Sequence, residues 1–157
     1  MSQLPHILTS LTDREAITDA LYRAILAFDN HDVAMFNSAF SGPDATFDLA
    51  GTFYDGLEAI RTQLLDFIGP MDTTHMLSNI RVDVKDGASS ASLTAYAQAQ
   101  HSPPGKGTDP AGPKFLAGST YFLDLVKDKS DGLWKVEKWV MKIIWTQGDG
   151  SVMQRPG

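Results

Sequence analysis

The chain has 157 residues, 43% hydrophobic and 20% charged, which is the composition of a folded globular protein rather than a disordered one. Its net charge of -6, without a basic run, argues against nucleic acid or an anionic membrane as a partner. The chain has no cysteine, which excludes disulfides, thiolate catalysis and zinc–sulfur sites, and we expect it in a reducing compartment, the cytoplasm. The apolar runs fall short of the ~20 residues of a membrane-spanning helix, and the N-terminus does not resemble a signal peptide.

The first predicted element is a long helix. Thr12 and Glu15 have the spacing of a capping box, in which the threonine accepts from the amide of the glutamate and the glutamate reaches back. The helix is expected to run to about Phe28, with Asp19 and Arg23 marking its solvent-facing side.

Asp29 follows on the side of this helix that the spacing predicts to be apolar. Tyr22, Ile25 and Leu26 precede it by seven, four and three residues and therefore share its side. The C-terminal end of a helix also disfavours an anion, because its unpaired carbonyls carry partial negative charge. Broken local rules tend to mark functional or strained sites, so Asp29 is the first candidate functional residue.

Three shorter elements complete the N-terminal half. Asp32 is expected to cap a short helix that Gly42-Pro43 ends. Strands over 45–49 and 52–54 are expected to form a hairpin. Apolar residues at helical spacing then predict another helix from Leu57, which Gly69-Pro70 stops.

The C-terminal half is predicted to be sheet. Four long runs have strand character, over residues 74–84, 88–101, 115–127 and 133–145. Asp-Gly pairs at 86–87 and 131–132 are typical of hairpin turns between them. Strands of this length twist and curve strongly. We therefore expect an α+β fold, a strongly curved antiparallel sheet with three helices of the N-terminal half packed on its concave face.

The chain shows no internal domain boundary, so we predict one domain over 1–157. Residues 1–11 are expected to be an N-terminal extension and residues 148–157 a flexible tail. The Pro- and Gly-rich segment 102–113 is a long loop between two strands, and such loops are functional or disordered. Either the loop or the tail can act as a lid over a pocket or be plain surface chain.

The second long strand predicts a pocket with a histidine at its edge. Side chains alternate along a strand, so Ala95, Ala97, Ala99 and His101 share one face, which we take as the inner one. Three alanines are too small to fill the space between a sheet and its helices, and a cavity lined by small residues with one imidazole is a plausible ligand pocket. The alternative is that helix side chains fill the gap and His101 merely ends the strand.

His75 opens the first long strand and has the wrong parity for the interior. It aligns with Leu77, whereas Ile80 and Val82 further along have the opposite parity. His75 can therefore face inward with them only if a bulge near Ser78-Asn79 shifts the register. Without such a bulge it is a surface histidine.

The remaining motifs favour chemistry without a cofactor. The chain has no closely spaced histidine pair and no EF-hand pattern, so we expect no metal. Gly105-Lys106-Gly107 lacks the strand–loop–helix context of a phosphate loop, and no serine lies in a nucleophile elbow. Histidine exchanges protons near neutral pH, and a buried aspartate can orient it.

The order of elements and several short segments resemble the SnoaL-like and scytalone dehydratase-like group of the nuclear transport factor two-like superfamily, which has a cone-shaped α+β barrel. The likeness rests on residues 22–32, Thr74-His75-Met76, Ala99-Gln100-His101 and residues 131–145, and it covers roughly residues 12–146. The resemblance implies that a histidine acts as base and acid in an elimination beside a ketone, with the aspartate supporting it. It thereby implies Asp29, His75 and His101 as the catalytic residues.

The chain departs from this group where tyrosines hold a water against the substrate carbonyl. Phe28 and Leu49 stand at those positions, and the asparagine expected on a later strand is replaced near Tyr121. Tyr54 or Tyr121 is a candidate replacement, and scytalone itself is not the expected substrate. The expected substrate contacts are Phe28, Leu49, Tyr54, Leu65 and Tyr121.

The leading hypothesis is a cofactor-independent lyase or isomerase (a dehydratase, isomerase or cyclase) acting on a small apolar cyclic metabolite such as a polyketide or terpenoid intermediate. The alternative is a non-catalytic ligand-binding or assembly subunit of the same fold, because fold does not fix function. A third hypothesis, a peroxide- or epoxide-opening hydrolase, requires a water-binding carboxylate cluster for which Asp48 and Asp55 are candidates. An apolar outer sheet face, with Tyr96 and tryptophans among positions 134, 139 and 145, predicts a homo-oligomer, either a dimer or a trimer.

Overall fold

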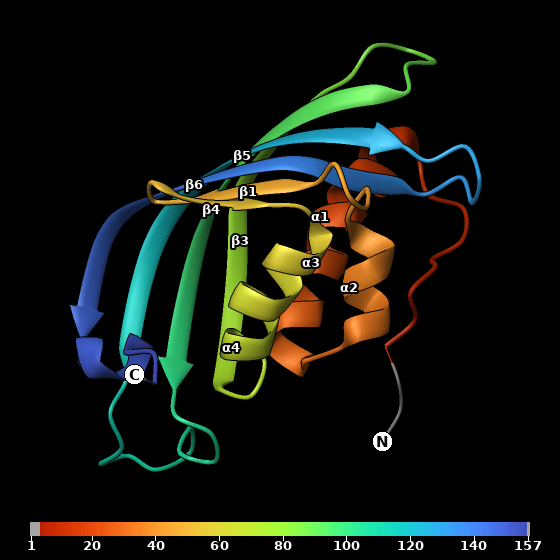
Figure 1. The fold of residues 1–157 in the computed structure, drawn as a ribbon. Helices are drawn as coiled ribbons and strands as arrows, with labels where there is room; N and C mark the ends of the chain where they lie inside the picture. Colours follow the sequence, from red (N-terminus) through yellow and green to blue (C-terminus); the bar gives the residue numbers. More distant parts are fainter. Residues whose placement is uncertain (1–3, 157) are drawn as a thin grey trace.

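One curved sheet of six strands encloses the helices on its concave side in the computed structural model, which describes residues 4–156 (Figure 1). The strands are β1 (Thr46–Leu49), β2 (Thr52–Asp55), β3 (Asp72–Asp83), β4 (Ser90–Ser102), β5 (Phe115–Lys127) and β6 (Trp134–Gly148). The predicted fold class, helices from the N-terminal half on a curved sheet, is confirmed.

The two N-terminal helices begin where their capping residues predict. Helix α1 spans Asp13–Asn30, two residues longer than expected, and both halves of the Thr12 capping box are formed. Helix α2 spans Val33–Ala39, and the Asp32 side chain accepts from the backbone of Met35. The extra length of α1 places Asp29 inside its last turn, before His31 ends the helix in the left-handed conformation (φ 49°).

The helix expected from Leu57 is divided into three short pieces. Helix α3 spans Leu57–Ile60, the π-helical turn η1 spans Arg61–Leu65 and α4 spans Asp66–Ile68. π-Helical turns are rare and occur frequently at functional sites. Leu64 of η1 lines the cavity described below.

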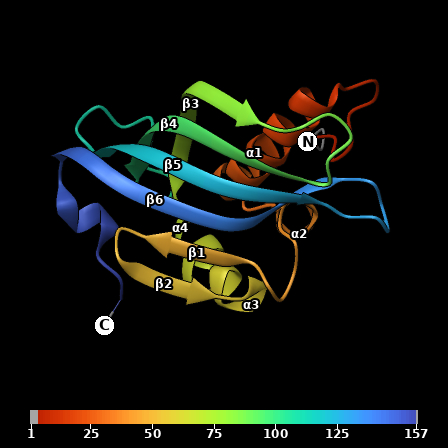
Figure 2. The same ribbon diagram turned by 90° about the horizontal axis from the view of Figure 1, so that it is seen from above.

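The sheet is mixed rather than purely antiparallel, and it is not a closed barrel. Its strand order is β2-β1-β6-β5-β4-β3, so β2 and β3 are free edges. The four long strands form the predicted antiparallel meander, but β1 pairs with β6 in parallel (Figure 2). The parallel bridge between Phe40 and Val136 starts this pairing before β1 begins, so the chain leaving α2 already runs alongside β6. The hairpin thereby covers an edge of β6 that would otherwise expose unpaired backbone groups.

Arg23 is buried, which contradicts its predicted place on the solvent-facing side of α1. Only 3% of its surface is exposed. Its guanidinium donates to the backbone oxygens of Ser38 and Trp134 and pairs with Asp19. A charged group held in this way can be buried, because each of its three nitrogens donates to an acceptor. Arg23 therefore ties α1 to the end of α2 and to β6.

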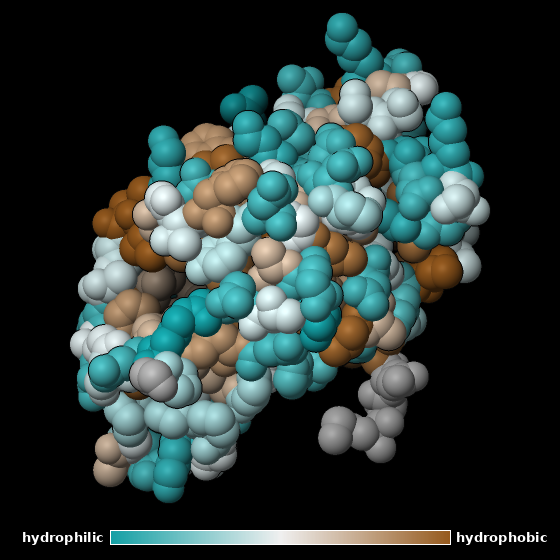
Figure 3. All heavy atoms as spheres, viewed as in Figure 1, coloured by the Kyte–Doolittle hydropathy of each residue, from teal (hydrophilic) through white to brown (hydrophobic). Residues whose placement is uncertain are grey.

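The outer face of the sheet carries exposed apolar side chains, which include Tyr96 and one of the three tryptophans considered. Trp134 and Trp139 are buried at 2% and 1% exposure, because their side chains point to the concave side and enter the core. Tyr96 and Trp145 are exposed, as are Met76 and Phe122. Figure 3 shows hydrophobic side chains in separate groups among hydrophilic ones. The homo-oligomer stays a prediction.

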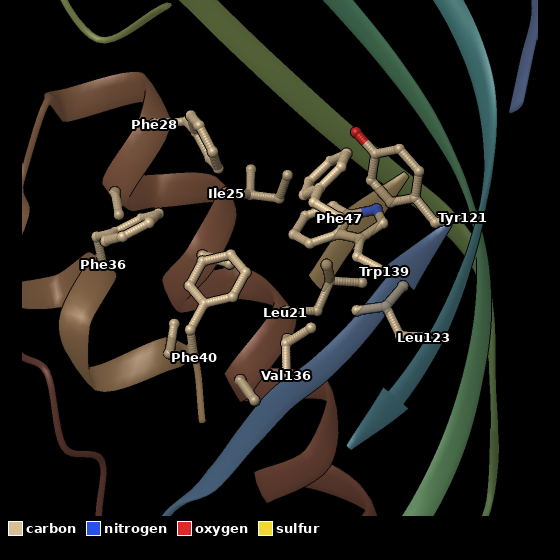
Figure 4. Close-up of a cluster of buried hydrophobic side chains, with 14 of the residues drawn as sticks. Leu21, Ile25, Phe28, Phe36, Phe40, Phe47, Tyr121, Leu123, Val136 and Trp139 are labelled. Carbon is tan, nitrogen blue, oxygen red and sulfur yellow. The ribbon is translucent and has the colours of Figure 1, made fainter. Parts of the chain in front are cut away.

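Aromatic residues pack between the helices and β6 (Figure 4). The ring of Trp139 stacks on Phe47 at 4.7 Å and on Phe40 at 6.2 Å, and Phe36 lies 4.7 Å from Phe40. The edge-to-face neighbour of Trp139 on the other side is Tyr121, at 4.9 Å. Large rings therefore fill one part of the concave space, whereas Ala97, Ala99 and Ala117 on β4 and β5 leave another part open.

The two irregular segments have defined contacts. In the 102–113 loop, Gly107 donates its N–H to Asp72 at the start of β3. The C-terminal segment forms the 3-10 helix η2 (Gly150–Met153), although the sequence predicts a flexible tail there. Arg155 then donates to the backbone oxygen of Gln63 at 2.7 Å and lies over the ring of Phe67. No helix within residues 4–156 is long and apolar enough to cross a membrane.

Candidate active site

A cavity of about 120 Å³ lies in the open part of the concave space. Helix α1, the η1–α4 segment, strands β1 and β3 to β6, and η2 all contribute to its lining. The lining residues are Ile25, Phe28, Phe47, Leu49, Leu64, Ile68, His75, Ala97, Ala99, His101, Phe115, Ala117, Ser119, Tyr121, Trp139, Met141, Ile143 and Met153. Most are apolar, and none is a lysine or arginine. A cavity of this kind, with a few convergent polar groups, is the typical form of a small-molecule site.

Asp29 and His75 form a hydrogen-bonded pair beside this cavity. The Asp29 Oδ1 lies 2.6 Å from Nδ1 of His75, and each side chain is 12% exposed. The other carboxylate oxygen accepts from the His75 backbone N–H at 2.9 Å, and the Thr73 hydroxyl donates to Oδ1 at 2.8 Å. These three donors offset the cost of removing the carboxylate from water. They also offset the cost of placing it at the C-terminal end of α1, where the helix dipole disfavours an anion.

The Asp29 carboxylate also fixes the tautomer of His75. A carboxylate only accepts, so Nδ1 of His75 carries the shared proton. The second ring nitrogen, Nε2, then presents a lone pair and has no partner among residues 4–156. This is the arrangement of a general base that a carboxylate orients.

The bulge that His75 requires is present in β3. The pairing with β4 shifts register between Ser78 and Arg81, and Asn79 adopts the left-handed conformation (φ 54°). The extra residue puts His75 on the same face as Ile80 and Val82, as the sequence predicts for a bulged strand.

His101 faces the same cavity from the end of β4. It is 5% exposed, and its ring centroid lies 5.6 Å from that of His75, edge to face. Its Nδ1 lies 3.2 Å from the Phe115 carbonyl oxygen, which can only accept, so Nδ1 carries the proton. Burial, followed by the neighbouring charge of His75, lowers the pKa of His101 below its ordinary value of 6.5. The ring is therefore neutral near pH 7, with Nε2 as an acceptor.

Three of the five expected substrate contacts line the cavity. Phe28 comes from α1, Leu49 from β1 and Tyr121 from β5. Burial, and then the charge of Asp29, raises the pKa of the Tyr121 hydroxyl far above its ordinary value. Tyr54 and Leu65 do not line it: Leu65 is fully buried in the core and Tyr54 packs against the core from β2.

Leu65 and Tyr54 miss the cavity for separate local reasons. On η1 and α4 the residues that face the cavity are Leu64 and Ile68, four positions apart, so the adjacent Leu65 points elsewhere. In β2, Tyr54 pairs with Phe47 of β1, and it is Phe47 that reaches the cavity.

Ser119, Thr73 and Met153 are among the residues of the site that were not predicted. Ser119 lines the cavity, Thr73 holds Asp29 and Met153 reaches the cavity from η2. Strand alternation contains the signal for two of them, because Ser119 shares the parity of Tyr121 and Thr73 that of His75. Met153 had no such signal, since its position depends on how the C-terminal segment folds back.

The carboxylates proposed for a hydrolase are not in the site. The side chain of Asp48 accepts from the Gly51 N–H in the β1–β2 turn, and neither Asp48 nor Asp55 lines the cavity. Within residues 4–156, no three His, Cys, Asp or Glu side chains gather so as to hold a metal ion.

Helices packed on the concave face of a curved sheet, with a cavity between the two, define the nuclear transport factor 2-like fold. A member of that superfamily from Salmonella enterica superposes with a TM-score of 0.69 at 15% identity, covering 85% of this chain and 92% of that one. The chain belongs to the family of SnoaL-like domains, whose family model matches residues 9–140.

Two further proteins are similar over nearly the whole chain. The terrestric acid biosynthesis cluster protein E of Penicillium crustosum is 44% identical over 150 residues, 95% of each chain. A candidate scytalone dehydratase from Novosphingobium aromaticivorans has the same fold, with a TM-score of 0.73, 21% identity and 87% of both chains covered.

Proposed function

We propose that this protein is a cofactor-independent acid–base lyase or isomerase that acts on a small apolar cyclic metabolite, such as a polyketide or terpenoid intermediate. The observation that carries the proposal is the 2.6 Å contact between Asp29 and His75 at the wall of a largely apolar cavity. A structural ion pair has no need of a cavity, whereas a proton-transfer catalyst needs its base to meet a substrate there.

The relatives support the same class of chemistry. The relative from Penicillium crustosum is a protein of a biosynthetic cluster, and the neighbour from Novosphingobium aromaticivorans is a candidate dehydratase. The cavity adds a size limit. A dry 150 Å³ cavity in another protein holds benzene, so about 120 Å³ accommodates roughly one ring before any side chain moves.

In the proposed mechanism His75 removes a proton from a carbon beside the substrate carbonyl. The proton passes to Nε2, the C–H electron pair forms the enolate, and Asp29 stabilises the resulting imidazolium through the Nδ1 hydrogen bond. In an elimination the imidazolium returns the proton to the leaving hydroxyl as the C–O bond breaks and water departs. In an isomerisation the proton returns to another carbon.

Hydrogen exchange on a simple ketone tests this proposal without knowledge of the natural substrate. Cyclohex-2-enone in D2O is expected to exchange its acidic C–H protons faster with the protein than without it, as followed by 1H NMR. Asp29→Asn and His75→Ala are each expected to slow this exchange by roughly 10²–10⁴-fold, the usual contribution of general acid–base catalysis. Asp48→Asn, at the β1–β2 turn, is the matched control and should exchange at the wild-type rate.

Exchange that persists at the wild-type rate in both Asp29→Asn and His75→Ala would contradict the catalytic role. The non-catalytic ligand carrier would then be the better explanation. Its signature is ketone binding at the cavity, seen as shifts of the His75 and His101 ring signals, without any acceleration of exchange.

A further inference from the structure

The cavity offers two proton acceptors but needs a donor for the chemistry proposed above. In the neutral state both histidines carry their proton on Nδ1, where Asp29 and the Phe115 carbonyl accept it. Both therefore present a lone pair at Nε2. Removing a proton beside a carbonyl builds negative charge on the carbonyl oxygen, and a preorganised donor at that oxygen is usually the largest catalytic contribution.

Only hydroxyl groups can supply this donor from the cavity wall. Apart from the two histidines, the lining residues with a polar hydrogen are Ser119, Tyr121 and Trp139. The indole N–H of Trp139 is buried without a partner and has less than 1 Å² of exposed surface, so no substrate atom reaches it. Ser119 and Tyr121 remain, two residues apart on the same face of β5.

Tyr121 holds its hydroxyl on a rigid ring that borders the cavity. Its ring is fixed edge to face against Trp139 at 4.9 Å, and the residue is 3% exposed. The hydroxyl points away from β5 into the interior (Figure 4) and makes no hydrogen bond within residues 4–156. The Tyr121 hydroxyl borders the cavity and is accessible from it. In this it differs from the fully buried, unpartnered polar atoms of Trp134, Trp139 and Ser41. Burial raises the pKa of Tyr121, so the phenol keeps its proton.

We propose that Tyr121 is a further catalytic residue that donates a hydrogen bond from its hydroxyl to the carbonyl oxygen of the substrate and stabilises the enolate. This proposal rests on the proposed function. It gives two polar groups of the cavity separate roles. The Asp29–His75 pair takes the proton from the C–H bond of the substrate, and Tyr121 binds the carbonyl oxygen of the substrate. The substrate class is thereby narrowed to uncharged ketones or enones, since the lining has no cation to bind a carboxylate.

The infrared carbonyl band of bound cyclohex-2-enone, labelled with 13C at the carbonyl, reports this hydrogen bond directly. The band is expected at lower wavenumber in the wild-type complex than in an apolar solvent and to return toward the solvent value in Tyr121→Phe. Removal of one such donor is expected to slow hydrogen exchange by roughly 10²–10³-fold. Tyr96→Phe, the same change on the outer face, is the matched control and should leave band and rate unchanged. Circular dichroism and the thermal midpoint verify that Tyr121→Phe is folded.

The outcomes separate the two proposals. If Tyr121→Phe keeps the wild-type band and rate while Asp29→Asn abolishes exchange, the assignment of Tyr121 is wrong and the proposed function stands. If the band shift is lost in Ser119→Ala instead, Ser119 is the donor and Tyr121 is not. If Asp29→Asn and His75→Ala exchange normally, the proposed function fails, whatever the band shows. Absence of ketone binding by the wild type would overturn both.

Discussion

The Asp29 carboxylate accepts from a side-chain N–H, a backbone N–H and a hydroxyl, all within 2.9 Å. Two of these donors come from His75 itself, so the aspartate fixes both the backbone and the ring of the proposed base. A base held in one tautomer and one rotamer has less conformational freedom to lose when the substrate binds. At the scale of single residues, this pair explains why a carboxylate is tolerated at the C-terminal end of a helix.

The two histidines of the cavity differ in their hydrogen-bond partners, and the lowered pKa of His101 makes the free energy of unfolding depend on pH. His101 faces His75 and is held by a carbonyl rather than a carboxylate, and its pKa is lowered by burial and by His75. As the pH falls, the unfolded chain takes up this proton at about 6.5, the ordinary value, before the folded chain does. His101 therefore lowers the free energy of unfolding as the pH drops from about 6.5 through the lower folded pKa.

His101→Asn is expected to reduce this acid sensitivity, because an asparagine amide can still donate to the Phe115 carbonyl but cannot take up a proton. The loss of urea stability between about pH 7.5 and about pH 5 should be smaller in the variant than in the wild type. The ring signals of His101 in NMR should titrate below 6.5 in the wild type. Titration of His101 at or above that value would contradict the prediction.

Among the strands, β3 has the irregularity on which the site depends. The pairing Ser78↔Tyr96 is followed by Arg81↔Thr94, so β3 advances three residues while β4 advances two. The extra residue switches the parity of the strand, and the segment before it turns Thr73, His75 and Leu77 to the inside. A regular strand of the same sequence would direct His75 to the outer face if Ile80 stayed in the core.

Deletion of Asn79 is expected to restore a regular ladder and to remove His75 from Asp29. Hydrogen exchange on cyclohex-2-enone should then fall to the level of His75→Ala, while the far-ultraviolet circular dichroism keeps its strand signal. Asn79→Gly is the matched control, since glycine adopts the positive φ of 54° without strain and preserves the bulge. Wild-type exchange in the deletion variant would show that the register of β3 does not position His75.

At the scale of the whole molecule, the cavity is enclosed by segments that are far apart in the sequence. Helix α1 provides one wall, the strands provide the opposite wall, and Met153 of η2 reaches the same space from the C-terminal end of the chain. Arg155 fastens this segment to η1 through the Gln63 carbonyl and lies 4.3 Å from the ring centroid of Phe67. The C-terminal segment is thus part of the cavity rather than an appendage.

Truncation after Gly148 is expected to weaken substrate binding more than the chemical step. It removes Met153 from the cavity wall and exposes the surface that Val152 covers, whereas Asp29 and His75 keep their contacts. The loss of about 1–2 kcal/mol of apolar contact corresponds to a roughly tenfold higher Kd for cyclohex-2-enone, with exchange at saturation changed little. Full-length Ser151→Ala, at an exposed position, is the control. An unchanged Kd in the truncated chain would show that η2 does not take part in binding.

Local sequence patterns predicted much of the fold. The capping residues Thr12 and Asp32, the Asp-Gly turns and the lengths of the strands predicted the helices and the meander, because these features depend on neighbours in the chain. They also placed His101 and three small residues on the inner face of β4, since alternation is a local rule. The parallel pairing of β1 with β6 depends on residues about ninety positions apart, and no local pattern contains it.

The sequence alone determined the order of the elements, because capping and periodicity are properties of short segments, and with the family resemblance it supplied the candidates Asp29, His75 and His101. Only the tertiary structure decided that Asp29 and His75 meet at 2.6 Å, that Arg23 is buried, and that Tyr121 rather than Tyr54 borders the cavity. Each of these depends on a bulge, a crossing of elements or a fold-back that joins distant parts of the chain. Burial and distance arise when separate elements pack together, and a single segment does not contain that information.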